Sequence, residues 1–127
     1  MQNENVVALY CRTAQKCDDA IALQEAMLWQ YAKDNGYRNT AVYVDNGFPG
    51  LTLEGRPGMD EIRQGMENGS INTVIVKDFS RIARGVYPLW AFANEAESHG
   101  AELISLTDGH FSQVMRNFIS HFIPTKA

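Results

Sequence analysis

The sequence predicts an α/β fold: a three-layer α/β/α arrangement with helices on both faces of a largely parallel central sheet of four to five strands. The first reason is that short segments rich in β-branched residues alternate with longer amphipathic segments along the chain. The second is that residues 6–11, VVALYC, are almost wholly apolar, which is typical of a strand covered on both faces. With 127 residues, 45% of them hydrophobic, we expect one domain over residues 1–127.

Four segments are predicted to be strands, and the first is expected to be central in the sheet. They cover residues 6–11, 40–44, 73–76 and 101–107. The second strand ends at Asp45 and is followed by a long loop, NGFPGLTLEGRPG, which contains four glycines. Loops of this length are uncommon in compact domains and often carry function.

The first predicted helix follows the first strand. It extends from about residue 20 to residue 35 and is expected to be capped by Asp18 and Asp19. Helical spacing predicts a buried stripe made of Leu23, Met27, Leu28 and Tyr31.

Three further helices are predicted. One extends from residue 57 or 58 to residue 69, with Met59, Ile62 and Met66 facing inward. The next covers about residues 87–99 and tolerates a proline in its first turn. The last is expected to be capped by Ser112, to end at Pro124, and to carry one apolar face formed by Met115, Phe118, Ile119 and Phe122. That face is expected either to form a dimer surface or to pack on the sheet of its own domain.

Charge and composition limit the possible partners. The net charge of −4 argues against a general nucleic-acid coat, so any binding to phosphate has to be local. No apolar segment is long enough to span a bilayer, and the start MQNEN lacks the features of a signal peptide. We therefore expect a cytoplasmic protein that makes no membrane contact.

Basic residues collect after the predicted strands. Arg12 follows the first strand, Lys77 follows the third, and Arg56 closes the long loop. Within KDFSRIAR, Arg81 and Arg84 are three residues apart and share one face of a helical turn. Ligands of α/β folds gather outside the carboxyl ends of the strands, so this set predicts an anion site suited to phosphate. The alternative is a set of surface ion pairs with Asp45, Asp78 or Glu95.

These residues resemble the catalytic domain of serine site-specific recombinases, the resolvase and invertase group. The similarity covers nearly the whole chain, through YCRTA, LQEAMLWQYAKDNGY, YVDNGFPG, LEGRPGMDEI and, most specifically, VIVKDFSRIARG. The family implies DNA recombination and integration by mobile elements. A serine hydroxyl attacks a DNA phosphodiester, a phosphoserine link forms, and strand exchange follows in a tetramer without metal or cofactor.

The resemblance also assigns roles by position. It implies that the scissile phosphate is held by Arg12, Arg56, Arg81 and Arg84, with Lys77 as a further phosphate-binding candidate. Gln24 and Asp45 would shape the pocket. Ser80 stands where family members carry aspartate or serine, so it agrees with the pattern.

The chain departs from the family at the nucleophile. The reactive serine is the second residue after the strand-one arginine, and that residue here is Ala14. Thr13 is a poor substitute because residues one apart on an extended segment face opposite ways. Ser80 is also a poor substitute, since attack on phosphorus needs an in-line approach. The enzyme is therefore expected to be inactive.

A second departure lies at the end of the sequence. Family members continue into a DNA-binding region, whereas this sequence stops at FIPTKA. We expect a catalytic domain without that region, with weak or local DNA binding and a homodimeric or tetrameric state.

Two other interpretations remain open. One is an interaction protein that forms a hetero-oligomer with an active recombinase and modulates it. The other is a receiver-type domain that binds magnesium through Asp45, Asp78 and Asp108.

Overall fold

A computed structural model describes residues 5–115 of the chain. Its sheet contains five strands in the order β2-β1-β3-β4-β5. Their bounds are β1 Val6–Thr13, β2 Thr40–Asn46, β3 Ile71–Val76, β4 Glu102–Ser105 and β5 Gly109–His110. All neighbours pair in parallel except β4 and β5, which are antiparallel. The predicted α/β class, the largely parallel sheet and the interior position of the first strand are confirmed.

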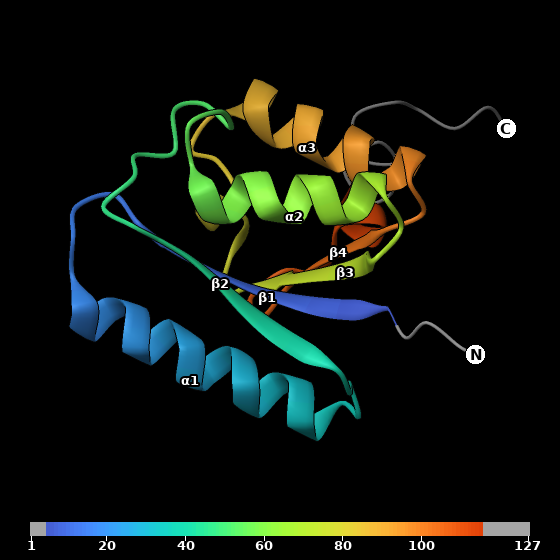
Figure 1. Ribbon diagram of the computed structural model, residues 1–127, viewed down its shortest axis with the longest axis horizontal. Coiled ribbons are helices and arrows are strands. Elements are labelled where there is room, and N and C mark those ends of the chain that lie inside the picture. The colour runs from blue at the N-terminus through green and yellow to red at the C-terminus, as the bar shows by residue number, and fades with distance from the viewer. Residues whose placement is uncertain (1–4, 116–127) are drawn as a thin grey trace, which may run out of the picture.

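The helices lie on the two faces of this sheet (Figure 1). Helix α1 (Asp18–Asp34) lies on one face, whereas α2 (Pro57–Glu67) and α3 (Val86–Ser98) lie side by side on the other. A short 3-10 helix, η1 (Phe79–Arg81), follows β3 directly. The predicted three-layer arrangement is therefore present.

The hydrophobic core is divided by the sheet into two clusters. On β1, Val7, Leu9 and Cys11 point to the α1 side, while Ala8 and Tyr10 point to the side of α2 and α3. This alternation follows from the two-residue period of a strand and explains why β1 is apolar throughout. The prediction that the second helix turns Met59, Ile62 and Met66 inward is confirmed, because all three are buried.

The predicted start and stripe of α1 are partly wrong. The helix begins at Asp18, so Asp18 and Asp19 lie in its first turn, and the residue at the cap is Cys17, without a side-chain cap. The acidic pair still suits this end, because carboxylates favour the positive end of the helix dipole. The buried side chains are Ile21, Gln24, Leu28 and Ala32. Leu23, predicted to be buried, is 61% exposed.

The end of β4 also differs from the prediction. The strand stops at Ser105 because its hydroxyl accepts hydrogen bonds from the backbone N–H groups of Thr107 and Asp108, which turns the chain toward β5. A helix then begins at residue 111, so Ser112 lies in its first turn rather than before it. The predicted apolar face at Phe118, Ile119 and Phe122 lies outside the described residues.

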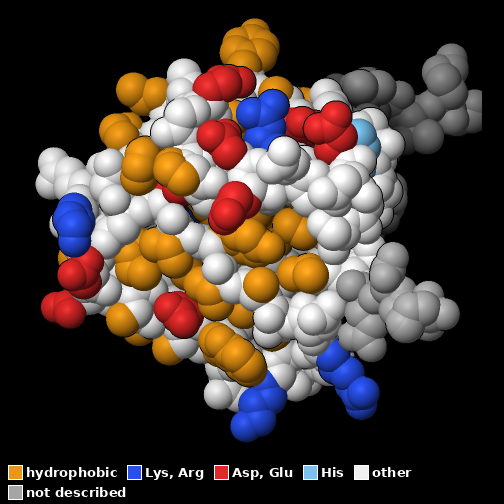
Figure 2. Space-filling model, in the orientation of Figure 1, with side chains coloured by type: hydrophobic (Ala, Val, Ile, Leu, Met, Phe, Trp, Pro, Cys, Tyr) orange, Lys and Arg blue, Asp and Glu red, His pale blue; other side chains and the backbone are white. Residues whose placement is uncertain are grey.

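Surface charge agrees with the composition. Figure 2 shows one face on which acidic and hydrophobic side chains predominate and the few lysine and arginine side chains lie mostly near the margin. Within the described part of the chain, no helix is long and apolar enough to cross a membrane.

Candidate active site at the carboxyl ends of the strands

The predicted basic residues meet at the carboxyl ends of β1 and β3. In the sheet, Arg12 of β1 lies opposite Asp45 of β2. On the other side, the ladder between β1 and β3 ends at Tyr10 opposite Val76. Arg12 therefore lies two residues beyond the end of the shared ladder, next to η1. Arg56 is the residue before α2, and Arg81 ends η1.

Arg12 is almost fully buried, with 2% of its surface exposed. Its guanidinium donates three hydrogen bonds to main-chain carbonyls: Nε to Arg81 at 2.8 Å, Nη1 to Phe48 at 2.8 Å and Nη2 to Ser80 at 2.5 Å. The side chain thus holds the long loop and the segment after β3 against the end of β1.

Arg56 is equally buried, at 2% exposure. It donates to the carbonyl oxygens of Thr52 at 2.9 Å and Arg81 at 3.1 Å, and to the Tyr10 hydroxyl at 2.8 Å. Arg12 and Arg56 therefore share the carbonyl of Arg81 as an acceptor. Nε of Arg56 is buried and has no acceptor among the described residues.

The outer basic residues are more accessible. Arg81 is partly buried and donates through Nη1 to the carbonyl of Arg12 at 3.0 Å, and its Nε lies 3.5 Å from the Asp78 carboxylate. Lys77 pairs with the same carboxylate at 3.4 Å. Arg84 is exposed, and its backbone N–H donates to the carbonyl of Gly50 at 2.8 Å.

The predicted ion pairs are therefore only partly present. Asp78 pairs with Arg81 and Lys77, whereas Glu95 pairs with Arg63 at 2.9 Å. Within residues 5–115, Arg12 and Arg56 are bonded to carbonyl and hydroxyl oxygens rather than to carboxylates.

Asp45 anchors the start of α2. Its buried carboxylate accepts hydrogen bonds from the N–H groups of Gly58 at 2.7 Å and Met59 at 2.9 Å, which are first-turn donors of the helix. It also accepts the Tyr10 hydroxyl at 2.5 Å. Burial, reinforced by this bond to Asp45, raises the pKa of Tyr10 well above its ordinary value, so the phenol stays protonated.

Gln24 closes the open side of β1. Its side-chain oxygen accepts from the Arg12 N–H at 3.1 Å, and its amide nitrogen donates to the Arg12 carbonyl at 3.0 Å. The amide replaces the strand partner that β1 lacks at this point, because β3 has already ended. A polar residue is therefore buried on the inner face of α1.

The cluster concentrates positive charge. Burial lowers the pKa of Arg12, and the nearby charges of Arg56, Arg81 and Arg84 lower it further, although Tyr10 opposes the shift. A site crowded with guanidinium groups gains stability when an anion enters, because bonds between charged partners are stronger than bonds to neutral oxygens. Phosphate, which offers several acceptor oxygens, fits this arrangement.

The three candidate nucleophile positions have different surroundings. Ala14 is exposed in the segment between β1 and α1. Thr13 is buried; its hydroxyl donates to Oδ1 of Asn46 at 2.7 Å and accepts from the N–H of Gly47 at 3.0 Å. The exposed hydroxyl of Ser80 is hydrogen-bonded to the Asp78 carboxylate.

Three residues of the site received no role from sequence. Tyr10 joins Asp45 to Arg56, and Gly50 packs on Arg12. Asn46 accepts from the Cys17 N–H at 2.9 Å and donates to Asp18 at 2.8 Å, so it fixes the segment that carries Ala14. All three lie in the motifs YCRTA and YVDNGFPG, but nothing in their spacing indicates these partners.

The magnesium interpretation receives no support from the described residues. Residues 5–115 contain no group of three or more His, Cys, Asp or Glu side chains arranged to hold a metal ion. The carboxylate of Asp45 is instead occupied by N–H and O–H donors.

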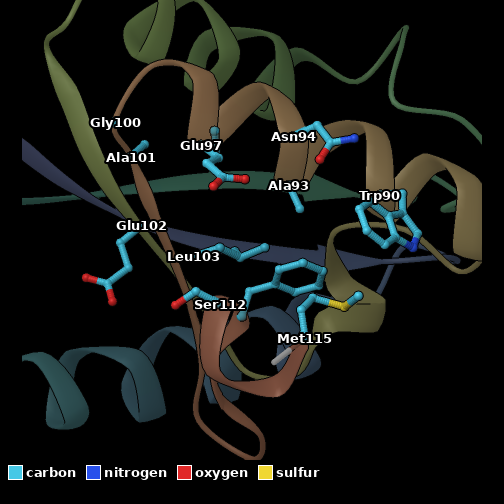
Figure 3. Close-up of a pocket in the computed structure, with 12 residues that line it drawn as sticks. Trp90, Ala93, Asn94, Glu97, Gly100, Ala101, Glu102, Leu103, Ser112 and Met115 are labelled. Atoms are coloured by element: carbon cyan, nitrogen blue, oxygen red, sulfur yellow. The ribbon is translucent and has the colours of Figure 1, made fainter. Parts of the chain in front are cut away.

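A separate hollow lies away from the arginine cluster. It has a volume of about 450 Å³ and lies between α3, β4 and the helical turn that begins at residue 111 (Figure 3). None of the basic residues at the strand ends lines it. The residues that the sequence predicts to bind phosphate therefore lie in the strand-end cluster and not in this hollow.

The chain is an α/β domain with an arginine cluster at its strand ends, and comparison with known proteins identifies its family. The family described as "Resolvase, N terminal domain" matches residues 7–125. The chain therefore belongs to this family, and the predicted resemblance is confirmed. No curated protein gave a significant match.

Solved structures agree with the family assignment. The N-terminal catalytic domain of TP901-1 integrase is 27% identical, with a TM-score of 0.80 over 91% of this chain and 88% of its own. A resolvase family site-specific recombinase from Streptococcus pneumoniae is 24% identical, with a TM-score of 0.75 over 93% and 85%. A serine recombinase from Sulfolobus solfataricus, 18% identical, has a TM-score of 0.66 over 93% and 79%. The fold is that of a serine recombinase catalytic domain.

Proposed function

We propose that this chain is a serine-recombinase catalytic domain that binds the phosphate backbone of DNA but does not cleave it. The observation that carries the proposal is the contrast between position 14 and its surroundings. Ala14 carries a methyl group in the place of the nucleophile, while Arg12, Arg56, Arg81 and Arg84 all lie at the strand ends.

The missing atom accounts for the lost step. In the recombinase reaction a serine oxygen attacks phosphorus, the bond from phosphorus to the 3′ oxygen breaks, and the 3′ hydroxyl leaves with a proton. The 5′ phosphate stays on the serine. Alanine has no oxygen to form that bond, whereas guanidinium groups would still offset the charge on phosphate oxygens.

Other hydroxyl groups near the site are unsuited to replace it. The Thr13 hydroxyl is buried and engaged with Asn46 and Gly47. The Ser80 hydroxyl is held by Asp78, which also binds the N–H of Ser80 at 3.1 Å. If either hydroxyl attacked phosphorus, it would have to give up these hydrogen bonds.

The test restores the oxygen. Ala14→Ser is compared with the natural chain for covalent attachment to supercoiled plasmid, with and without a grafted DNA-binding region, by denaturing gel electrophoresis. We expect an adduct in the serine variant alone, mapping to position 14. Ala22→Ser, which makes the same change at an exposed alanine of α1, is the matched control and should form none. An adduct of the unmodified chain would refute the proposal.

A second candidate is a partner that pairs with an active recombinase and modulates it. Large apolar side chains exposed on the first turns of α3, namely Val86, Tyr87 and Trp90, favour this role because such surfaces often bind proteins. Sedimentation with a full-length recombinase tests it. Binding that is lost in Tyr87→Ala would support the role, and a monomer that binds no recombinase at high concentration would oppose it.

A further inference from the structure

The loop after β2 covers the guanidinium of Arg12. A methyl group placed on Gly50 would lie 2.8 Å from Nη2 and 2.9 Å from Cζ of Arg12, closer than a side-chain carbon ever approaches. The backbone of Gly50 lies directly against the charged group, so an added methyl has to move either the loop or the guanidinium. We call residues 47–50 the cover.

The cover is tied down at both of its ends. The N–H groups of Gly47 and Phe48 donate to the Thr13 carbonyl at 3.1 and 2.8 Å. At the other end, the carbonyl of Gly50 accepts the Arg84 N–H at 2.8 Å. Since Arg12 also donates to the Phe48 carbonyl, the cover, the end of β1 and the segment after β3 form one hydrogen-bonded unit.

The cover and the segment after β3 together surround the Arg12 guanidinium with weak acceptors, Phe48 from the cover and Ser80 and Arg81 from the segment. All three hydrogen bonds from the Arg12 guanidinium go to neutral carbonyls, and each such bond is weaker than one to a charged oxygen. Nε of Arg56 is buried and lacks an acceptor among the described residues, and the buried Nε of Arg81 makes no hydrogen bond there but lies 3.5 Å from the Asp78 carboxylate. An anionic ligand would satisfy these donors and reduce the repulsion among the arginines.

We propose that the cover is a lid that a DNA phosphodiester must displace before Arg12 can bind it. The phosphate oxygens replace the carbonyls of Phe48 and Ser80 as acceptors, the bond between Arg84 and Gly50 opens, and Gly50 moves away from the guanidinium. The affinity for phosphate is lowered by the free energy needed to open the lid. This inference rests on the proposed phosphate site and adds that the cover controls access of phosphate to Arg12.

The experiment separates the lid from the site. Inorganic pyrophosphate is titrated into the full chain while NMR follows the Arg12 Nε–H signal and hydrogen exchange at the Arg84 amide. We expect the Arg12 signal to shift and the Arg84 amide to lose protection. In Gly50→Ala the added methyl holds the lid open, so pyrophosphate should bind about tenfold more tightly.

The matched control is Gly55→Ala. Gly55 lies in the same loop with φ of +79°, so alanine strains the loop, but its methyl meets nothing within 4 Å. It should bind pyrophosphate like the natural chain. If it also binds about tenfold more tightly, general loosening of the loop explains the result and the lid is wrong.

Each remaining outcome decides one of the two proposals. Pyrophosphate binding with an unchanged Arg84 amide and equal affinity in Gly50→Ala overturns the lid and leaves the phosphate site standing. Binding by Gly50→Ala alone supports the lid. Failure of both proteins to bind overturns the phosphate site and the lid together. If Gly50→Ala does not fold, exchange at Arg84 in the natural chain decides.

Discussion

The inner and outer members of the arginine cluster have the same side chain but different surroundings. Arg12 and Arg56 are 2% exposed and donate to oxygens of their own chain, whereas Arg84 is exposed and its guanidinium has no hydrogen bond or ion pair among the described residues. The inner pair therefore holds loops together, and the outer residues are accessible to a ligand. All of these residues are arginines at the strand ends, so the two roles are distinguished only by burial and by hydrogen-bond partners.

If the inner residues stabilise the fold more than the outer ones do, the largest loss of stability is expected from Asp45→Ala. The change leaves the N–H groups of Gly58 and Met59 and the Tyr10 hydroxyl without their buried acceptor. The free energy of unfolding should fall by about 3 kcal/mol or more, measured by urea denaturation. The control Asp78→Ala removes a partly exposed cap of η1 and should cost about 1 kcal/mol. If both variants lose the same free energy of unfolding, the hydrogen bonds of Asp45 are no more important for stability than those of Asp78.

A smaller loss is expected from Tyr10→Phe. The phenylalanine keeps the packing but removes the hydroxyl that donates to Asp45 and accepts from Arg56. We expect the free energy of unfolding to fall by about 1 to 2 kcal/mol in thermal or urea denaturation. Tyr43→Phe on β2 is the matched control, because within residues 5–115 the Tyr43 hydroxyl has no hydrogen-bond partner, and its stability should be nearly unchanged. If Tyr10→Phe leaves the free energy of unfolding unchanged, the hydroxyl does not stabilise the fold by connecting Asp45 to Arg56.

The smallest effect concerns pH and the outer region. Burial raises the pKa of Asp78, but the hydrogen bond from Ser80 and the charges of Arg81 and Lys77 outweigh it and hold the pKa below its ordinary value. A carboxylate with a lowered pKa stabilises the fold above the unfolded pKa of about 4, and this stabilisation is lost as pH falls through the folded pKa. Asp78→Asn should therefore be less stable than the natural chain at pH 6; the difference should begin to shrink at about pH 4 and vanish once the pH lies below the lowered folded pKa of Asp78. A difference that persists at lower pH would exclude this charge effect.

Much of the fold could be predicted because the signals are local. The apolar strand at residues 6–11, the inward residues of α2 and the alternation of strands with helices follow from periodicity. The strand-end position of the arginines follows from topology, since parallel strands end at one edge. The family followed from the motif around Arg81, and its match over residues 7–125 confirms it.

The contacts of the site could not be predicted, because they depend on packing between distant segments. Hydrophobicity predicts that Leu23 lies on the inner face of α1. Gln24 is buried there instead, because the backbone N–H and C=O of Arg12 need hydrogen-bond partners. Likewise, the sequence predicts that Arg12 binds an anion, whereas its guanidinium is bonded to carbonyls of the loop after β2 and of η1. The roles assigned to Arg12, Arg56, Arg81, Arg84, Lys77, Ser80, Gln24 and Asp45 in binding phosphate stay predictions.

The hydrogen bonds of Arg12 also bear on which mutations the molecule tolerates. Its acceptors are the main-chain carbonyls of Phe48, Ser80 and Arg81, and every amino acid supplies a carbonyl at its position. Side chains at positions 48 and 80 can therefore vary without loss of these bonds, whereas a side chain at position 50 meets the Arg12 guanidinium and has to displace it or the loop. In a deep mutational scan read out by abundance, positions 48 and 80 should be permissive, and positions 12 and 50 should be the least tolerant.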